Sequence, residues 1–444
     1  MRKIILFLLI FALVACTAPT EEAPDWEGYD PFAAADPQVA IPLSTLLPPT
    51  RAPGEAIATP TPNKPQFAPA DQQGSGFKII PDSELVYGPA SLLLNMEIYL
   101  KGKNGYLKSY QQEVDGEILS GTEIITRVAQ DYSVNPRLLL ALLEYQSGWV
   151  TQENVDETEF PMRYYMEWYA GLYRQLVWTA NELNHGYYLW RANAVTEWTL
   201  VDGSLLPVNP NINAGTAGLQ NYFALLYTRD TWEYDVSEEG FFATYKSLFG
   251  YPFDYAIEPL VPTNLAQPQL TLPFVRGETW SFTGGPHGGW DTGSGWAALD
   301  FAVGDPQGCL PAKAWTVASA PGVVVRSGNG VVVLDLDGDG YEQTGWTLLY
   351  MHMGTEGRVQ NGSKLEAGAK IGHPSCEGGL SNAAHLHFAR RYNGEWIPAD
   401  GSIPFILDGW VSSGTGDDYD GYLTRGDQSV EAWDGQNPIN EIKR

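Results

Sequence analysis

Two histidines separated by one residue, in His385-Leu386-His387, constrain this chain of 444 residues more than any other feature. In a β-strand, side chains two positions apart point to the same face, so a strand here would present both imidazoles to one site. The chain has only 6 histidines, and most of them lie in its last third. We therefore expect a functional site built on β-structure, rather than ordinary strand and loop histidines.

Three further residues, His287, Asp300 and His352, carry the same kinds of side chain. Imidazole and carboxylate groups suit Zn²⁺, and three protein ligands with a fourth position open to water are typical of a catalytic zinc site. His287, Asp300 and one imidazole of the pair would complete such a set. His352 and the other imidazole would then be free to act as acid, base or oxyanion stabiliser.

Five short stretches make the C-terminal part similar to the lysostaphin-type (LytM-like) zinc endopeptidases, which cut peptide cross-links in bacterial cell walls. The resemblance covers roughly residues 268–410 and implies an antiparallel β peptidase domain, with zinc as cofactor and peptidoglycan as partner. It implies that His287, Asp300 and His387 bind the metal, while His352 and His385 line the reacting carbonyl and water. The stretches are Gly285-Pro286-His287-Gly288-Gly289, Ala298-Leu299-Asp300-Phe301-Ala302, Ala318-Ser319-Ala320-Pro321-Gly322-Val323-Val324, Tyr350-Met351-His352-Met353 and Ala384-His385-Leu386-His387-Phe388.

The position of the aspartate departs from the family pattern. Asp291 stands at the family's usual spacing from the first histidine, whereas Asp300 lies 13 positions after His287. Asp291 falls in a segment rich in Gly and Ser that reads as a loop, and Asp300 falls in an apolar, strand-like run over residues 296–303. We predict an insertion between the two ligands, with Asp300 rather than Asp291 on the metal.

The N-terminus predicts where this chemistry takes place. Arg2 and Lys3 precede an apolar run over residues 4–14, and Leu13-Val14-Ala15-Cys16 matches a lipoprotein cleavage box. The sequence thus predicts a signal peptide over residues 1–15 and a lipid on Cys16 that anchors the mature protein to a membrane from outside the cytoplasm. An uncleaved N-terminal helix is the alternative.

The cysteine count agrees with an extracytoplasmic location. Lipidation of Cys16 leaves Cys309 and Cys376, and an even count in an oxidising compartment suggests a disulfide. Such a bond would close a long loop, which is worth on the order of 4 kcal/mol in the chain-entropy model. Two free buried thiols are the alternative.

The charge balance argues against nucleic acid as a partner. The chain has 26 basic and 53 acidic residues, a formal net charge of −27, whereas binding to nucleic acid relies on a basic surface. We interpret this acidity as a solubility feature.

Residues 16–76 are dominated by Pro, Ala, Thr and acidic residues, and we predict a disordered tether there.

Residues 77–262 have a helical signature. Ser120 and Glu123 have the spacing of a capping box, Asn135-Pro136 is typical of a second helix start, and residues 215–227 are a third candidate.

The stretches over residues 128–136 and 141–149 resemble the lysozyme-like fold of lytic transglycosylases. That resemblance implies a catalytic Glu where this chain has Gln146, which cannot donate and recover a proton as a carboxylic acid does. Glu144 is no obvious substitute, because residues two apart on a helix point in different directions. We therefore expect a non-catalytic domain. Its dense aromatics between residues 164 and 198 favour a helical core over a sugar-stacking surface.

Asp335, Asp337 and Asp339 have the alternating carboxylates that open a Ca²⁺-binding loop. The twelfth position of that loop is Trp346 rather than a bidentate Glu, and a polar β-hairpin turn explains the same residues. Calcium is thus the weaker interpretation. We assign no role to His185, and His373 could edge a substrate groove or simply face solvent.

Together these features predict a multidomain chain. A mostly α, lysozyme-like domain over residues 77–262 would precede the antiparallel β, LytM-type peptidase domain over 268–410, with an acidic tail or hairpin over 411–444. The predicted function is a membrane-anchored, extracytoplasmic zinc metallopeptidase that hydrolyses peptide cross-links of peptidoglycan. A non-enzymatic wall-binding scaffold or regulator of other wall hydrolases is the alternative.

Overall fold

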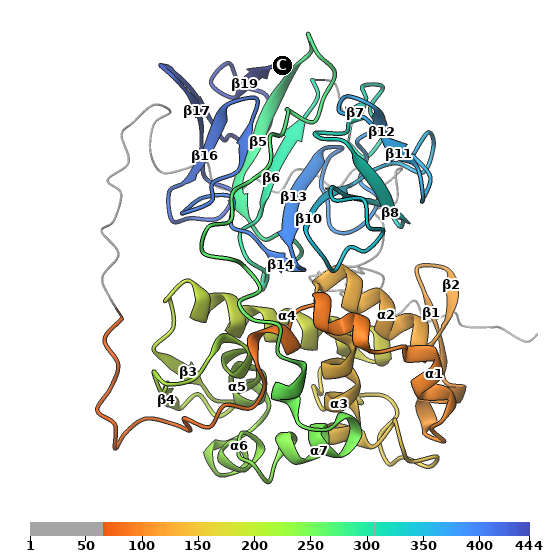
Figure 1. Ribbon diagram of the computed structural model, residues 1–444, viewed down its shortest axis with the longest axis vertical. Helices are drawn as coiled ribbons and strands as arrows, with labels where there is room; N and C mark the ends of the chain where they lie inside the picture. Colours follow the sequence, from red (N-terminus) through yellow and green to blue (C-terminus); the bar gives the residue numbers. More distant parts are fainter. Residues whose placement is uncertain (1–64, 305–307) are drawn as a thin grey trace, which may run out of the picture.

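A computed structural model describes residues 65–304 and 308–444, which form two domains stacked end to end (Figure 1). Cys16, the predicted signal peptide and most of the predicted tether lie outside the described residues. Within residues 65–304 and 308–444, no helix has the length and apolar character needed to cross a membrane.

The N-terminal domain is built from helices that enclose one hydrophobic core. Its two small hairpins, β1–β2 and β3–β4, lie at the edges. Helices α4 and α5 pack closely against each other, and α2 crosses α4. The elements are α1 (Met96–Lys101), α2 (Gly121–Tyr132), α3 (Pro136–Ser147), α4 (Leu172–Arg191), α5 (Ala214–Leu226), α6 (Arg229–Asp235), α7 (Phe241–Phe249), β1 (Gln111–Val114), β2 (Glu117–Ser120), β3 (Glu197–Thr199) and β4 (Leu205–Pro207), with short 3-10 helices at Asp82–Glu84, Pro89–Leu93, Tyr106–Ser109, Glu167–Tyr169 and Pro252–Tyr255.

The helix starts predicted from the sequence are confirmed. Ser120 accepts a hydrogen bond from the Glu123 amide, and the Glu123 carboxylate accepts one from the Ser120 amide, so both halves of the capping box are present at α2. Asn135 caps α3, with Pro136 in its first turn. The aromatic region is mostly core, as predicted: Tyr187 is fully buried, although Tyr165 is 61% exposed.

The predicted tether ends earlier than expected. Residues 65–76 run along the helical domain: Gly74 donates a backbone hydrogen bond to Pro207, and Gln220 donates one to the Ser75 carbonyl. Phe67 packs near Trp190 at 6.1 Å between ring centroids. These apolar and hydrogen-bonding contacts outweigh the local composition, so this stretch belongs to the folded domain.

The C-terminal domain is a nine-stranded sheet with a second, four-stranded sheet packed against it. The large sheet has the order β11-β8-β9-β10-β13-β6-β5-β19, with β14 also paired to β13, and the small one runs β15-β16-β17-β18. The elements are β5 (Thr279–His287), β6 (Ala298–Ala302), β7 (Thr316–Val317), β8 (Gly322–Gly328), β9 (Val331–Asp335), β10 (Trp346–Met351), β11 (Lys364–Leu365), β12 (Lys370–Gly372), β13 (Leu386–Tyr392), β14 (Glu395–Trp396), β15 (Ile406–Leu407), β16 (Trp410–Gly414), β17 (Gly421–Arg425), β18 (Gln428–Glu431) and β19 (Glu441–Lys443).

The segment after residue 411 is part of this domain. β17 and β18 pair antiparallel as a hairpin, and β19 pairs with β5 at the edge of the large sheet. Ile442 of β19 is buried in the same core as Trp280. The chain therefore continues well past residue 410 before the β-domain is complete, because β5 would otherwise be an uncovered edge strand.

The two faces of the large sheet have different partners. One face packs on a core of large apolar side chains that include Leu299, Phe301, Leu386 and Phe388. The other face carries a smaller apolar cluster, Ala297, Ala298, Val331, Val333, Leu349, Met351, Ala389 and Trp396, against which Tyr188 of the helical domain packs. The helical domain thus covers part of this second face, which we call the domain-facing side of the sheet.

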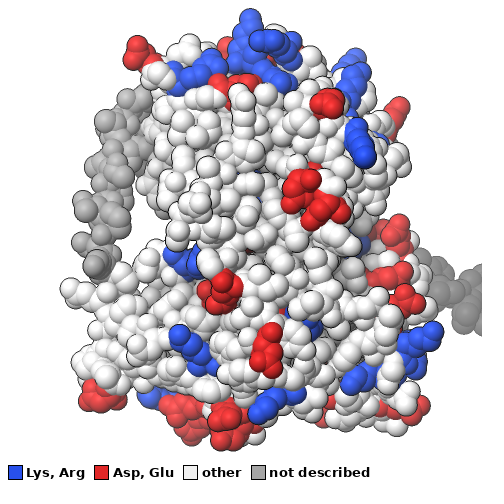
Figure 2. Space-filling view, in the orientation of Figure 1, with Lys and Arg blue, Asp and Glu red and all other residues white. Residues whose placement is uncertain are grey.

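Polar contacts fix the domains against each other. Glu395 of β14 is buried, and it pairs with Arg191 of α4 at 2.7 Å and accepts a hydrogen bond from the Tyr187 hydroxyl. Arg326 of β8 pairs with Asp131 of α2. Figure 2 shows a group of basic side chains at the end of the peptidase domain that lies away from the helical domain, while further basic and acidic side chains are spread over both domains.

Candidate metal centre

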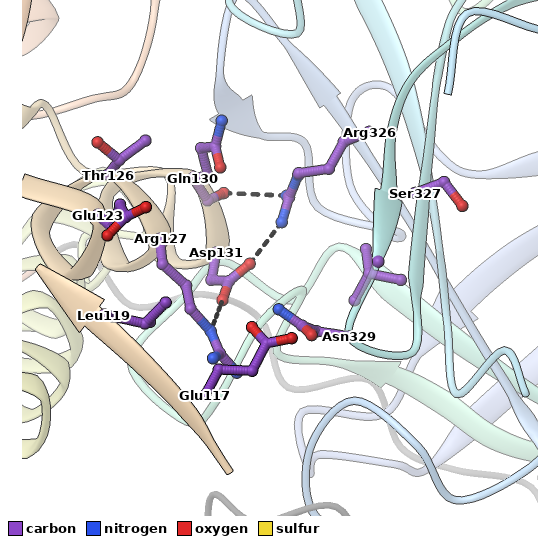
Figure 3. A pocket seen from close by; sticks show the side chains of 12 residues that line it. Glu117, Leu119, Glu123, Thr126, Arg127, Gln130, Asp131, Arg326, Ser327 and Asn329 are labelled. Atoms are coloured by element: carbon purple, nitrogen blue, oxygen red, sulfur yellow. Dashed lines mark hydrogen bonds and ion pairs between the residues drawn. The ribbon is translucent and has the colours of Figure 1, made fainter. Parts of the chain in front are cut away.

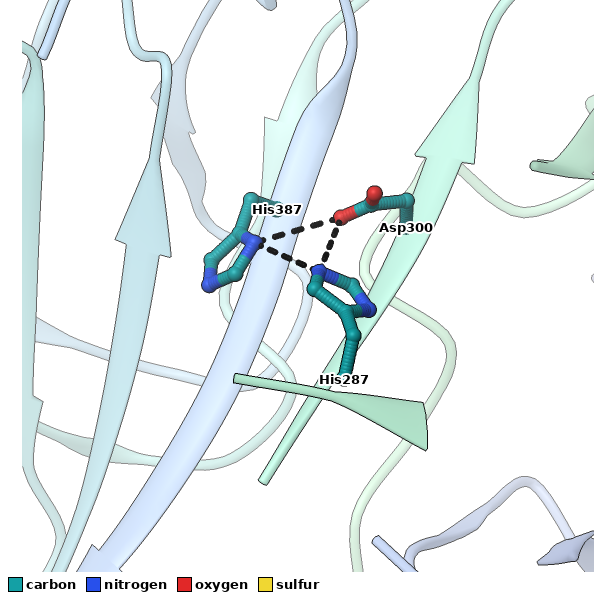
Figure 4. Close-up of side chains that lie close together, drawn as sticks. All are labelled: His287, Asp300 and His387. Atoms are coloured by element: carbon teal, nitrogen blue, oxygen red, sulfur yellow. Dashed lines mark hydrogen bonds and ion pairs between the residues drawn. The ribbon is translucent and has the colours of Figure 1, made fainter. Parts of the chain in front are cut away.

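Three neighbouring strands bring His287, Asp300 and His387 together (Figure 4). In the register of β13 with β6, His387 stands directly opposite Asp300. Their strand neighbours Leu386 and Leu299 point into the core, so alternation sends the His387 and Asp300 side chains to the domain-facing side of the sheet. His287 ends β5, next to β6, and all three residues are buried.

The three side chains present one atom each to a common point. His287 Nε2 lies 3.0 Å from His387 Nδ1, and each of these nitrogens lies 3.3 Å from Asp300 Oδ1. For tetrahedral zinc with bonds of about 2.0–2.1 Å, neighbouring ligand atoms would be separated by about 3.3–3.4 Å. The triangle thus has the dimensions that a zinc ligand set requires.

Backbone carbonyls determine which imidazole nitrogens carry lone pairs. His287 Nδ1 is 2.7 Å from the Gly285 carbonyl, and His387 Nε2 is 3.1 Å from the Gly289 carbonyl. A carbonyl only accepts, so these nitrogens are the protonated donors. The lone pairs are therefore on His287 Nε2 and His387 Nδ1, which face Asp300. Such hydrogen bonds behind a ligand fix the tautomer and the ring orientation.

The electrostatics of the triangle call for a cation. Burial opposes ionisation of Asp300, but positive charge on the surrounding imidazoles, His287 foremost, holds the pKa of its carboxyl well below its usual range. A metal ion bound by the nitrogen lone pairs would supply the same positive charge with both imidazoles neutral. Within the described residues, Asp300 Oδ1 is buried without a hydrogen-bond partner. A buried charged oxygen beside two nitrogen lone pairs is costly unless a positive ion sits between them. Two imidazole nitrogens and one carboxylate oxygen are a ligand set that suits zinc, so His287, Asp300 and His387 fit this metal.

His352 and His385 form the other side of the site. Their rings are 4.5 Å apart between centroids, and His385 Nε2 is 3.8 Å from Asp300 Oδ2. His352 donates through Nδ1 to the Glu377 carbonyl at 3.0 Å, and His385 donates through Nδ1 to the Ala383 carbonyl at 2.9 Å. Each ring therefore keeps its Nε2 atom for other chemistry.

His352 is held in a neutral, strained state. Burial, together with the neighbouring His385 and His387, lowers its pKa well below the usual histidine range. Its backbone φ is 62°, in the left-handed region that non-glycine residues rarely adopt. Strain of this kind persists only where the surrounding structure enforces it. Here the Ser375 amide and hydroxyl both donate to the His352 carbonyl.

The disulfide predicted from the cysteine count is present between Cys309 and Cys376, which are 67 positions apart in the sequence. Cys376 lies between Ser375 and Glu377, the two residues that hold the backbone and the ring of His352. The bond therefore ties the segment that orients His352 to the loop after β6.

Asp291 lies away from the metal triangle. It belongs to the loop between β5 and β6, where it accepts a hydrogen bond from the Tyr132 hydroxyl of α2 at 3.0 Å. In the same loop the Gly293 amide donates to Asn181 of α4. The insertion between His287 and Asp300 thus contacts the helical domain, and the structure brings Asp300 rather than Asp291 to the other candidate ligands.

The three aspartates of the β9–β10 connection also lie close together, with one oxygen of each within 4.8 Å of the others. Backbone amides already occupy these carboxylates: Asp335 accepts from Asp337, Gly338 and Gly340, and Asp339 accepts from Tyr341. Such bonds are what a polar hairpin turn requires. Calcium at Asp335, Asp337 and Asp339 stays a prediction.

In the helical domain, Gln146 and Glu144 both have structural partners. Gln146 is buried, donates to the Tyr222 hydroxyl and accepts from the Tyr227 hydroxyl at 2.6 Å. Glu144 accepts from the amides of Val150 and Thr151, just beyond the end of α3.

The two remaining histidines lie outside the metal centre. His185 pairs with Glu182 on the surface of α4. His373 donates to the Ala314 carbonyl and packs on Trp315 at 3.8 Å between ring centroids. Neither belongs to the group that could hold a metal ion.

Sequence reasoning missed Tyr419, which the β16–β17 loop brings to the site. Its ring stacks on His287 with centroids 4.1 Å apart and planes 17° from parallel. The Gly285 amide donates to the Tyr419 carbonyl, and the Tyr419 amide donates to Pro286. The only signal in the sequence was an aromatic residue in an acidic Gly-rich stretch, which says nothing of its tertiary position.

Comparison with known families gives two matches. Residues 78–262 match the N-terminal domain of LasA, and residues 310–398, which include His352, His385 and His387, match peptidase family M23. Protease LasA of Pseudomonas aeruginosa is 25% identical over 342 residues, which cover 70% of this chain and 76% of LasA.

Shorter matches concern the C-terminal domain. The beta-lytic metalloendopeptidase of Achromobacter lyticus is 29% identical over 175 residues, covering 36% of this chain and 43% of that protein. Among solved structures, the M23 metalloprotease pseudoalterin from the deep sea is 25% identical, covers 38% of this chain and 97% of its own, and has a TM-score of 0.30. Together with the His/Asp/His site, these matches support a LytM-like zinc metalloendopeptidase, whose residues 310–398 are similar to peptidase family M23.

Proposed function

We propose that this protein is an extracytoplasmic enzyme, held to a membrane by a lipid on Cys16, that hydrolyses peptide cross-links of peptidoglycan. The observation that carries the hydrolytic part is the triangle of His287 Nε2, His387 Nδ1 and Asp300 Oδ1, with its 3.0–3.3 Å edges. Asp300 Oδ1 is buried and has no hydrogen-bond partner in the part of the chain that the structure describes. LasA and the beta-lytic metalloendopeptidase are proteases by name. The wall peptide as substrate is our extension from the family.

The proposed ligands are His287, Asp300 and His387. Zinc bound there supplies Lewis-acid polarisation of the scissile carbonyl and lowers the pKa of a nearby water. His352 is neutral because burial lowers its pKa, so its Nε2 can accept the proton of the attacking water. His385, whose ring lies 4.5 Å away, can donate a hydrogen bond through Nε2 to the developing oxyanion when its ring is doubly protonated, because Nδ1 already donates to the Ala383 carbonyl.

Digestion of purified wall with known cross-link chemistry tests this function. We expect new amino termini at the cross-link, identified by mass spectrometry of the released fragments. The matched control is His352→Ala, which should keep bound zinc and release no fragments. Release of sugars without new amino termini would contradict the proposal.

The lipid anchor is a separate part of the proposal, supported by the sequence around Cys16 alone. Metabolic labelling with a radioactive fatty acid should label the wild-type chain in its bacterial host and leave Cys16→Ser unlabelled. Equal labelling of both chains would overturn this part.

For the helical domain we propose a non-catalytic role: it would position the peptidase domain relative to the cell wall. Gln146 stands where the resemblance to lytic transglycosylases implies an acid, and its amide is held by two tyrosine hydroxyls. The alternative, a wall-binding scaffold without activity, is disfavoured because all five candidate side chains of the peptidase site are present and converge.

A further inference from the structure

Three consecutive residues, Ser375, Cys376 and Glu377, hold the segment that carries His352. The Ser375 amide and hydroxyl donate to the His352 carbonyl at 2.7 and 3.0 Å. Cys376 is bonded to Cys309. The Glu377 carbonyl accepts from His352 Nδ1 at 3.0 Å. The contact from Glu377 is thus made to the imidazole ring itself, and the proposed reaction gives the Glu377 side chain no role.

The Glu377 side chain returns to the segment that carries His352. Its carboxylate accepts from the amide and the hydroxyl of Thr355, both at 2.7 Å, and pairs with Arg358 at 3.3 Å. The same Arg358 nitrogen donates to the Met353 carbonyl at 2.8 Å. Thr355 and Arg358 lie three and six positions after His352. Glu377 therefore contacts this segment twice, with its carbonyl on the ring and with its carboxylate on the residues just beyond it.

The Glu377 carbonyl belongs to a peptide unit that could turn if the side chain were released. Gly378 and Gly379 follow it, with φ of 84° and 122°. Because glycine adopts many backbone conformations at little cost, the local chain does not fix the direction of this carbonyl. The β8–β9 turn, where Figure 3 labels Asn329, limits the space on one side: a Cβ on Gly378 would lie 2.6 Å from the Asn329 carbonyl oxygen. The anchored carboxylate restrains the residue on the other side.

The direction of the Glu377 carbonyl matters because it selects the reactive nitrogen of His352. With Nδ1 as donor to this carbonyl, the lone pair is on Nε2, the atom that accepts the proton of the attacking water. The backbone of His352 is strained, with φ of 62°, and such strain persists only where surrounding contacts enforce it. A ring that loses the Glu377 contact can rotate or change tautomer, and either change moves the lone pair away from the water.

We propose that Glu377 is a positioning residue for hydrolysis: its anchored carboxylate holds its own carbonyl on His352 Nδ1 and thereby directs the Nε2 lone pair at the attacking water. The inference rests on the proposed function, since His352 is the base in that mechanism. Glu377 acts through His352 rather than on the reacting groups.

Two variants of Glu377 separate its parts. Glu377→Ala removes the anchor and should lower kcat on a soluble cross-linked wall peptide by about 10–100-fold, because a misaligned base loses much of its contribution. KM should stay within about twofold of wild type, and bound zinc should be unchanged. Glu377→Gln keeps an acceptor for the Thr355 amide and should recover most of the lost kcat.

Asp408 provides a matched control in the same domain. Its carboxylate accepts from the Leu272 amide at 2.9 Å and pairs with Arg444 at 3.4 Å, and its side chain is 30% exposed, compared with 32% for Glu377. It lies in the β15–β16 turn, outside the segments that hold His352. Asp408→Ala should lower the thermal midpoint about as much as Glu377→Ala and keep the wild-type kcat. A merely structural role for Glu377 would make the two variants alike in kcat.

Proton NMR of the zinc-loaded full chain observes the ring without turnover. A hydrogen-bonded imidazole N–H gives a downfield signal, which His352→Ala assigns by its disappearance. The signal should be present in wild type, Glu377→Gln and Asp408→Ala, and absent in Glu377→Ala.

Four results would each overturn the proposal: no such signal in wild type, a signal that persists in Glu377→Ala, its loss in Asp408→Ala, or an unchanged kcat in Glu377→Ala. If the wild type did not hydrolyse wall peptide at all, the proposed function would fail, and the NMR comparison would still decide whether Glu377 positions the ring.

Discussion

His387 and Asp300 stand opposite each other on β13 and β6, with His387 Nδ1 3.3 Å from Asp300 Oδ1. This pairing fixes both side chains on one face of a continuous sheet, and His287 joins them from the next strand. Strand register, rather than loop conformation, therefore sets the spacing of the predicted ligands. A site on rigid elements is organised before any metal or substrate arrives.

The choice between the two aspartates can be tested by isosteric substitution. Asp300→Asn removes the charge at the centre of the triangle, so the variant should lose stoichiometric zinc, measured by metal analysis after dialysis. Asp291→Asn should keep its zinc, because Asp291 contacts Tyr132 of the other domain and not the triangle. Zinc retained in Asp300→Asn and lost in Asp291→Asn would reverse the assignment.

The two histidines of the H-L-H strand should behave differently. His387→Ala removes a proposed ligand and should abolish both zinc binding and hydrolysis. His385→Ala should keep zinc and lower kcat by about 10²–10⁴-fold, the usual contribution of a positioned proton donor or acceptor. Zinc content and initial rates on wall substrate measure the two effects. A zinc-free His385→Ala would show that the roles are exchanged.

The sequence was most informative where function depends on residues close in the chain. The spacing of His385 and His387 predicted a shared face, and the apolar run around Asp300 predicted a strand, because alternation in a strand is a local property. The capping box at Ser120 and Glu123 was readable for the same reason.

Features that depend on tertiary packing could not be read in this way. Tyr419 stacks on His287, although the two residues are more than a hundred positions apart in the sequence. β19 pairs with β5 at the edge of the sheet, although its sequence looks like a polar tail. Residues 65–76 have the composition of a tether and yet pack on the helical domain. In each case the determining contact is with a distant segment, so local composition carried no signal.

The helical domain should not cleave glycan. Gln146 cannot act as a general acid, and the Glu144 carboxylate is occupied by the amides of Val150 and Thr151. Wild-type digests of glycan strands should therefore contain no anhydro-sugar ends by mass spectrometry. Glu144→Gln should leave wall hydrolysis unchanged and lower the free energy of unfolding by about 1–2 kcal/mol, since hydrogen bonds to a charged acceptor are lost. Glycan cleavage that disappears in Glu144→Gln would refute a non-catalytic domain.

The stability of the helical domain should fall as the pH rises through the titration of Asp235. This carboxyl ends α6, accepts a hydrogen bond from the Tyr145 hydroxyl and keeps its other oxygen buried without a partner among the described residues. Burial raises its pKa from 3.8 to about 6. Between these two values the folded state binds more protons than the unfolded state, so stability is highest below about pH 4 for this group and is lost as the pH rises to 6.

Replacing Asp235 by Asn removes this ionisation and keeps an acceptor for Tyr145. We expect Asp235→Asn to raise the free energy of unfolding at pH 8 by about 1–3 kcal/mol relative to wild type, and to have little effect at pH 4, because one pKa unit corresponds to about 1.4 kcal/mol. Urea unfolding at the two pH values measures the difference. Asp230→Asn, an exposed position on the same helix, is the matched control and should track the wild type at both. If the stabilities of the wild type and of Asp235→Asn change by the same amount between pH 4 and pH 8, Asp235 does not carry this dependence.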